Sequence, residues 1–178
     1  MTIIVDDAGA GDLLLGVVIG AYRLETREYR YDIIDVKYFQ PPRFRRKEYL
    51  EQASKITLRL LDKLKPTAEE PIKICQGYIF DKAVHDLHET YGEERVSRTQ
   101  VDGEAQLYTE TAYLDEIKNL GYMPITSREQ KRAKSFFHMM NWLQRNPEKV
   151  NYAKTGWPRL AQYQFFTALR RKPRLYRT

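Results

Sequence analysis

The spacing of apolar and polar residues along the chain predicts strands in its first part and mostly helices afterwards. Several short segments are rich in β-branched and aromatic residues, which favour extended structure. Other segments place apolar residues three or four positions apart, as amphipathic helices do. The predicted strands are residues 2–5, 13–23, 29–39, 71–80 and 95–101. The predicted helices are residues 44–64, 81–92, 103–121, 127–146 and 158–170.

This order of elements, β-β-β-α-β-α-β-α followed by further helices, predicts an α/β domain with a mixed sheet. Short links join the first three strands, so we expect them to pair as an antiparallel meander. Leu107 and Ile117 are expected on the buried face of the helix over 103–121. Asp81 is expected to cap the helix that it begins. The 178 residues can bury the core of one domain, and none of the apolar runs approaches the length of a membrane span.

Charge is distributed unevenly along the chain. Residues 123–178 carry 13 Lys or Arg and two acids, a net charge of +11, whereas the remaining 122 residues carry 17 basic and 22 acidic residues, a net charge of −5. We therefore divide the chain into a core over residues 1–122 and a basic helical extension over residues 123–178 that packs on the same domain. Clustered cations favour a nucleic-acid partner, although a solvated or assembly surface has the same composition. Within the extension, Arg170, Arg171 and Lys172 are the expected phosphate contacts.

Three carboxylates follow the first apolar run, in the stretch IIVDDAGAGDLLLGVV. Asp6 and Asp7 are adjacent at the end of a predicted strand, so their side chains are expected on opposite faces. Carboxylates at a strand end can hold Mg²⁺ or Mn²⁺, which activate water for phosphodiester cleavage. Asp102, just after the strand over 95–101, would share an ion with Asp6 if their strands are neighbours. The simpler alternative is that these residues cap the following turn or helix.

This constellation resembles type 2 ribonucleases H. The stretch VDDAGAGDLLLGVV has the strand, acidic pair and Ala-Gly-x-Gly turn with which that family begins. Residues 35–56 are similar to the family's Asp-Ser-Lys-Lys-Leu segment and the helix after it, and VDGEAQ stands where the family has Gly-Asp before a helix. The expected order of elements is also that of the ribonuclease H-like fold. The resemblance covers residues 1–120.

The resemblance implies a metal-dependent endonuclease that acts on the RNA strand of RNA–DNA hybrids, or on a related structured nucleic acid. Asp6, Asp7 and Asp102 would be the catalytic residues and would bind Mg²⁺ or Mn²⁺, with Asp6 bridging the ions. The substrate's sugar-phosphate would be contacted by the backbone of Gly9, Ala10 and Gly11.

Three residues differ in type from the family pattern, and Gly16 of the second strand comes one residue late. Asp7 stands where the family usually has Glu, Ala10 where it has Arg, and Gln76 where it has an Asp at the end of the fourth strand. Gln76 can offer a carbonyl oxygen but no charge, which lowers affinity for a cation. Asp81 and Glu104 are therefore further candidate ligands beside Gln76.

Two alternatives remain open at this stage. A nucleic-acid-binding protein on the same fold, without catalysis, is favoured by Gln76. The stretch DDAGAGD also matches a motif of ribokinase-like sugar kinases, in which Asp12 would be the base and the segment after Gly11 would be a helix. The single cysteine, Cys75, and the lack of a recognisable secretory signal lead us to expect a cytoplasmic protein with no membrane partner.

Overall fold

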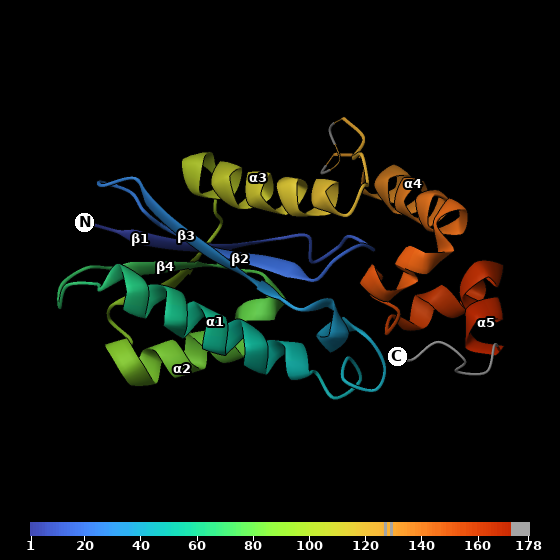
Figure 1. The fold of residues 1–178 in the computed structure, drawn as a ribbon. Helices are drawn as coiled ribbons and strands as arrows, with labels where there is room; N and C mark the ends of the chain where they lie inside the picture. Colours follow the sequence, from blue (N-terminus) through green and yellow to red (C-terminus); the bar gives the residue numbers. More distant parts are fainter. Residues whose placement is uncertain (127, 129, 172–178) are drawn as a thin grey trace.

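A computed structural model describes residues 1–126, 128 and 130–171 of the 178-residue chain. The described residues form an α/β structure with one open, mixed sheet of five strands (Figure 1). The strands are β1 (Ile3–Ala8), β2 (Val17–Arg23), β3 (Glu28–Ile34), β4 (Ile72–Cys75) and β5 (Val96–Thr99). The helices are α1 (Glu48–Leu64), α2 (Asp81–Tyr91), α3 (Gly103–Asn119), α4 (Arg132–Arg145) and α5 (Gln164–Arg171). Short 3-10 helices are η1 (Val36–Phe39), η2 (Tyr78–Phe80), η3 (Pro147–Tyr152) and η4 (Pro158–Gln162).

The strands lie in the order β3-β2-β1-β4-β5. β2 pairs antiparallel with both β1 and β3, which confirms the expected meander. β4 pairs parallel with both β1 and β5. The mixed sheet and the order β-β-β-α-β-α-β-α are therefore as expected from the sequence.

Different helices cover the two faces of the sheet. α1 and α2 pack on one face and α3 packs on the other (Figure 1). The core between the sheet and the first pair of helices contains aliphatic residues from every strand of the sheet, among them Ile3, Val5, Ile19, Ile34, Ile72, Ile74 and Val96. β1 is the central strand of the sheet, with β4 beside it.

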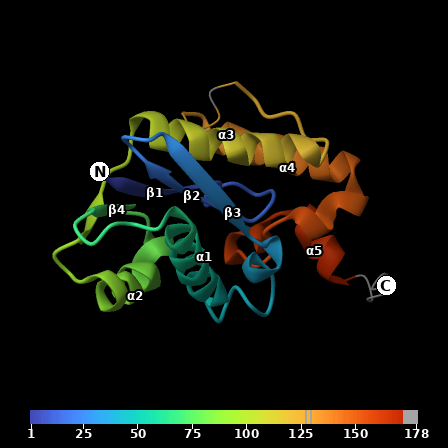
Figure 2. The ribbon, with the colours of Figure 1, turned by 60° about the vertical axis from the view of Figure 1, so that its left-hand side comes forward.

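The extension shares a second core with the body of the protein. Buried residues of the extension, including Phe136, Leu143 and Trp157, belong to the same cluster as Ala8, Leu13, Val18, Tyr113 and Ile117. α4 and α5 lie beyond the end of the sheet at which β1 ends (Figures 1 and 2). The extension therefore packs against the segment that follows the acidic pair.

The boundaries of the first two strands differ from the prediction. β1 continues through Ala8, so the acidic pair lies inside the strand rather than after it. β2 begins only at Val17, because Leu14 instead forms an isolated bridge with Ala153 and Leu15 has a φ of 63°. The apolar run over 13–16 is thus buried by the extension and not by strand pairing.

Two expectations about helices are wrong. Leu107 is 62% exposed, because α3 buries Ala105, Thr109 and Tyr113 on the face that meets the sheet. The side chain of Asp81 does not cap α2 but accepts a hydrogen bond from Arg98, with 2.7 Å between Nη2 and Oδ1. Within the part of the chain that the structure describes, no helix is both long enough and apolar enough to cross a membrane.

Candidate functional site

The acidic pair lies where two parallel strands separate. β1 pairs with β4 from Ile3 through Val5, and the last pair is Val5 with Ile74. Beyond that point β1 continues beside β2 alone, which leaves Asp6 and Asp7 next to the end of β4. Ligands in open α/β sheets bind at the carboxyl ends of such strands. The topology thus places both carboxylates at a position suited to binding.

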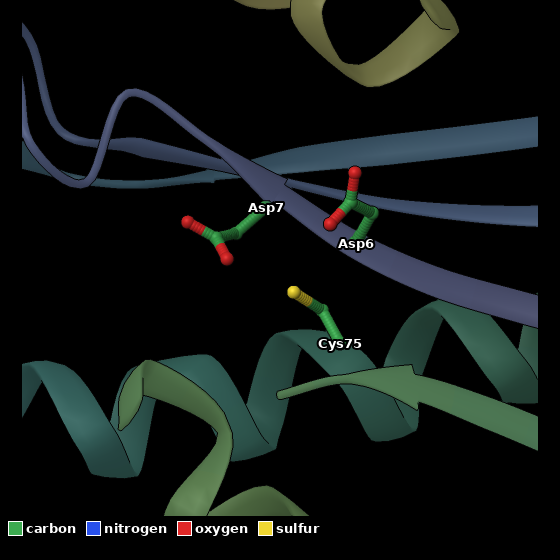
Figure 3. A group of neighbouring side chains, drawn as sticks. All are labelled: Asp6, Asp7 and Cys75. Atoms are coloured by element: carbon green, nitrogen blue, oxygen red, sulfur yellow. The ribbon is translucent and has the colours of Figure 1, made fainter. Parts of the chain in front are cut away.

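Asp6, Asp7 and Cys75 form a compact group of possible metal ligands (Figure 3). One ligand atom from each residue lies within 4.8 Å of the others, with Asp6 buried and the other two partly buried. Asp6 and Asp7 are successive residues of β1, whose side chains leave the strand on opposite faces, yet their ligand atoms still come close together. Past its last pair with β4, the strand has an open side that the carboxylates of both residues can reach.

Burial and mutual repulsion shape the electrostatics of this group. Burial, and then the charge of Asp6, raise the pKa of Asp7 to about 7, although Lys154 and Arg132 oppose the shift. Burial also raises the pKa of the Cys75 thiol to about 11, with both carboxylates contributing. At neutral pH Asp7 is therefore partly protonated and Cys75 is a thiol. A bound cation would favour the ionised carboxylate.

A pocket of about 420 Å³ opens over the acidic pair. Its lining includes residues from the loop after β1, the ends of β4 and β5, and α3: Gly9, Ala10, Gly11, Asp12, Gln76, Gly77, Gln100, Val101, Gln106 and Glu110. Arg128 and Arg132 supply its positive charge. The pocket therefore combines carboxylates with guanidinium groups.

Arg128 joins two of the pocket's acids. Its guanidinium donates hydrogen bonds to Asp12 and Glu110 and lies over the ring of Tyr113, 4.9 Å from the ring centre. The single positive charge of Arg128 offsets one of the two negative charges of Asp12 and Glu110. Arg128 is therefore occupied by these two carboxylates, and the pocket keeps negative charge there as well as at the acidic pair.

The glycine-rich loop is held by a lysine of the extension. Lys154 is fully buried, and its Nζ donates to the carbonyl oxygens of Gly9 at 2.8 Å and Asp12 at 2.7 Å. Burial lowers its pKa to about 7, although Asp12 raises it. Gly9 has a φ of 87°, and a Cβ there would lie 2.2 Å from Cε2 of Tyr113, so only glycine fits.

The backbone on either side of Lys154 is fixed by backbone hydrogen bonds to other segments. The Leu15 amide donates to the Tyr152 carbonyl at 2.7 Å, and the Lys154 amide donates to the Leu13 carbonyl at 2.9 Å. The Gly156 amide donates to the Phe39 carbonyl at 2.9 Å. The residues around Lys154 therefore run between the glycine-rich loop and η1.

No family model, curated protein or solved structure matches this chain.

The structure brings together only some of the candidate ligands. Gln76 lines the pocket with the acidic pair. Asp102 precedes α3, is exposed and does not line the pocket, because Gln100 and Val101 occupy that side after β5 ends. Asp81 is also outside the pocket lining, paired with Arg98. Glu104 accepts a hydrogen bond from the Tyr22 hydroxyl at 2.6 Å, away from the lining.

The structure does not have the helix that the sugar-kinase alternative requires. The segment after Gly11 is an irregular loop that leads into β2 and not a helix, so it presents no helix N-terminus to an anion. Asp12, which would be the base, is buried and paired with Arg128.

Some candidate residues lie outside the described part of the chain, and some residues of the site carry no local sequence signal. Arg170 and Arg171 end α5, but their side chains, together with the whole of Lys172, lie outside the described residues. Sequence reasoning does not identify Arg128, Arg132 or Lys154 as parts of the site. Their only signal is the positive charge of the extension, which says nothing about where each residue lies.

Proposed function

We propose that this protein is a divalent-metal-dependent nuclease of ribonuclease H-like type, acting on the RNA of RNA–DNA hybrids or on a related nucleic acid. The observation that carries the proposal is the convergence of Asp6 and Asp7 in a pocket that also contains Arg132. The strand order β3-β2-β1-β4-β5, with the acids on the central strand, is compatible with such a fold.

The residues of the site fit a hard divalent cation. Asp6 and Asp7 offer carboxylate oxygens, and Gln76 lies close by with a neutral amide oxygen. The raised pKa of Asp7 reflects negative charge held in a buried place, which a cation would compensate. Bound Mg²⁺ or Mn²⁺ would supply Lewis-acid chemistry and an activated water.

The chain's own groups would position the nucleic acid. Arg132 would bind a phosphate oxygen beside the acidic pair, and the backbone of Gly9, Ala10 and Gly11 would contact the sugar-phosphate. Lys154 fixes the conformation of that loop by donating hydrogen bonds to its carbonyl oxygens. Asp7 must release its proton to hold a cation, so the affinity of the site for a cation increases as the pH rises towards about 7.

A nucleic-acid-binding protein without catalysis is the second candidate. It is favoured by the absence of Asp102, Asp81 and Glu104 from the pocket and by Gln76 at a position where a third carboxylate would strengthen metal binding. Binding would then rest on the arginines and on the basic extension.

Cleavage assays distinguish the two candidates. Labelled RNA–DNA hybrid, double-stranded DNA and single-stranded RNA are incubated with Mg²⁺, with Mn²⁺ and with chelator. The nuclease is supported if the wild type cleaves the hybrid in a metal-dependent way. Asp6→Asn should then lose this cleavage, and the matched control Asp102→Asn should retain it. No cleavage, with salt-sensitive binding that Asp6→Asn leaves unchanged, supports the binding protein.

A further inference from the structure

A second depression adjoins the acidic pocket. It has a volume of about 450 Å³ and is lined by Ala10, Gly11, Tyr78, Arg132, Trp157, Pro158 and Arg159. Ala10, Gly11 and Arg132 also line the acidic pocket, so the two hollows share one wall. A ligand that occupies the first hollow can therefore extend into the second.

Two arginines of this depression are available to an anion. Among the residues that the structure describes, neither Arg132 nor Arg159 forms an ion pair, whereas Arg128 is taken up by two carboxylates. The Arg159 guanidinium lies on Trp157, 4.3 Å from the ring centre, and also contacts the ring of Phe136 at 5.0 Å. Because stacking fixes the plane of a guanidinium, its donors are oriented before a ligand arrives.

Tyr78 supplies an exposed aromatic surface in the same depression. Its side chain is 53% exposed, and Tyr49 meets it edge-on at 6.3 Å between ring centres. Tyr78 directly follows Gly77, where an added Cβ would lie 3.1 Å from Oδ1 of Asp7. The backbone that carries Tyr78 therefore lies beside Asp7. Trp157 is only 8% exposed and is covered by Arg159, so it orients the arginine rather than meeting a ligand.

An exposed ring that lines the same depression as two arginines suits one class of ligand in particular. Nucleotides with unpaired bases stack on aromatic side chains while their phosphates bind Arg or Lys. A base inside a duplex is already stacked and paired, so it cannot offer its face to Tyr78. The combination favours a single-stranded segment over a continuous duplex.

We propose that this depression binds a nucleotide with an unpaired base, next to the position of cleavage. The base stacks on Tyr78, and the flanking phosphates bind Arg132 and Arg159. This inference rests on the proposed nuclease function and deepens it. The substrate is a nucleic acid in which a single-stranded segment adjoins the part held over Asp6 and Asp7.

Equilibrium binding in chelator tests the depression without requiring cleavage. A fluorescent RNA–DNA hybrid with blunt ends is compared with the same hybrid carrying a short single-stranded extension, on either strand in turn. The variants are Tyr78→Ala and the double variant Arg132→Gln/Arg159→Gln. The controls are Tyr31→Ala, an exposed tyrosine of β3, and Arg145→Gln, an exposed arginine of α4; neither residue lines the depression.

We expect the extended hybrid to bind about tenfold more tightly than the blunt one. Tyr78→Ala removes that advantage. The double variant reduces the slope of the logarithm of the binding constant against the logarithm of salt concentration by about one to two units, as expected for the loss of one or two phosphate contacts. Both controls keep the advantage. Equal binding of the two hybrids by the wild type, or an advantage that survives Tyr78→Ala, overturns the proposal.

The two proposals fail in different ways. In one outcome, the protein binds the hybrid with a single-stranded end more tightly through Tyr78 and yet cleaves no substrate with either metal. That result supports the nucleotide site and contradicts the nuclease. Metal-dependent cleavage lost in Asp6→Asn, without any extension preference, retains the nuclease and removes the nucleotide site.

Discussion

The Nζ of Lys154 donates a hydrogen bond to the carbonyl oxygen of Gly9 across 145 positions of sequence, at 2.8 Å. Gly9 follows the acidic pair after one residue, so the extension determines the shape of the loop beside the site. The lysine is fully buried, and its ammonium also binds the Asp12 carbonyl. The loop that is expected to meet a sugar-phosphate is therefore built from both parts of the chain.

The buried lysine makes stability rise with pH above neutrality. Its pKa is lowered from 10.5 to about 7, so between these values the unfolded chain binds more protons than the folded chain. The free energy of unfolding should then increase by up to about 1.4 kcal/mol per pH unit in this window. Denaturant unfolding of wild type and Lys154→Met between pH 7 and pH 10 measures the effect. The variant lacks this increase, whereas Lys134→Met, at an exposed position, retains it.

Asp7 produces the opposite dependence below neutrality. Its pKa is raised from 3.8 to about 7, so the folded chain binds more protons between these values and loses stability as the pH rises. Asp7→Asn removes this loss. In unfolding experiments from pH 4 to pH 7, wild type should become progressively less stable relative to the variant. An equal pH profile for both proteins would show that Asp7 titrates normally.

Two glycines of the loop should respond differently to the same substitution. Gly9→Ala places a Cβ against the buried ring of Tyr113 at a positive φ, and should lower the free energy of unfolding by about 3 kcal/mol. Gly11→Ala meets nothing within 4 Å and should change it by less than about 0.5 kcal/mol. Chemical denaturation of the two variants measures both values. Similar losses would contradict the arrangement of Gly9 against Tyr113.

The thiol of Cys75 should be slow to react at neutral pH. Its pKa is about 11 because it is buried beside two carboxylates, and only the thiolate is nucleophilic. Alkylation by iodoacetamide, followed by mass spectrometry, should be far slower in the folded protein than in the same protein unfolded in urea. Rapid labelling of the folded chain would indicate an ionised or freely exposed sulfur.

Local patterns were sufficient to predict most of the fold. Runs of β-branched residues located all the strands, and the spacing of apolar residues located the helices, because both signals come from single elements. The exceptions arose where tertiary contacts decide. The apolar residues Leu13 and Leu14 resemble a strand but are buried by the extension, and Leu107 is exposed although the helix period favoured burial.

The site was only partly predictable for the same reason. Asp6 and Asp7 stand out in the sequence because two adjacent carboxylates follow an apolar run. Gln76 could be assigned to the site because it directly follows the strand that pairs parallel with β1. Asp102 was expected at the site if the strand before it lay next to β1, but β4 lies between β1 and β5, and Asp102 is exposed outside the pocket lining. Arg132 and Lys154 depend on contacts between segments far apart in sequence, which no local pattern records.

The bridge between Leu14 and Ala153 also bears on the order in which the protein folds. During synthesis the meander and its acidic pair leave the ribosome long before the residues that hold the loop after them. Contacts of such large sequence separation form late, since the chain entropy of closing them must be overcome first. The sheet can therefore form on a nascent chain whose loop is still open. The site is completed only after the extension has been synthesised. An unfinished chain therefore contains the acidic pair without the fixed loop beside it.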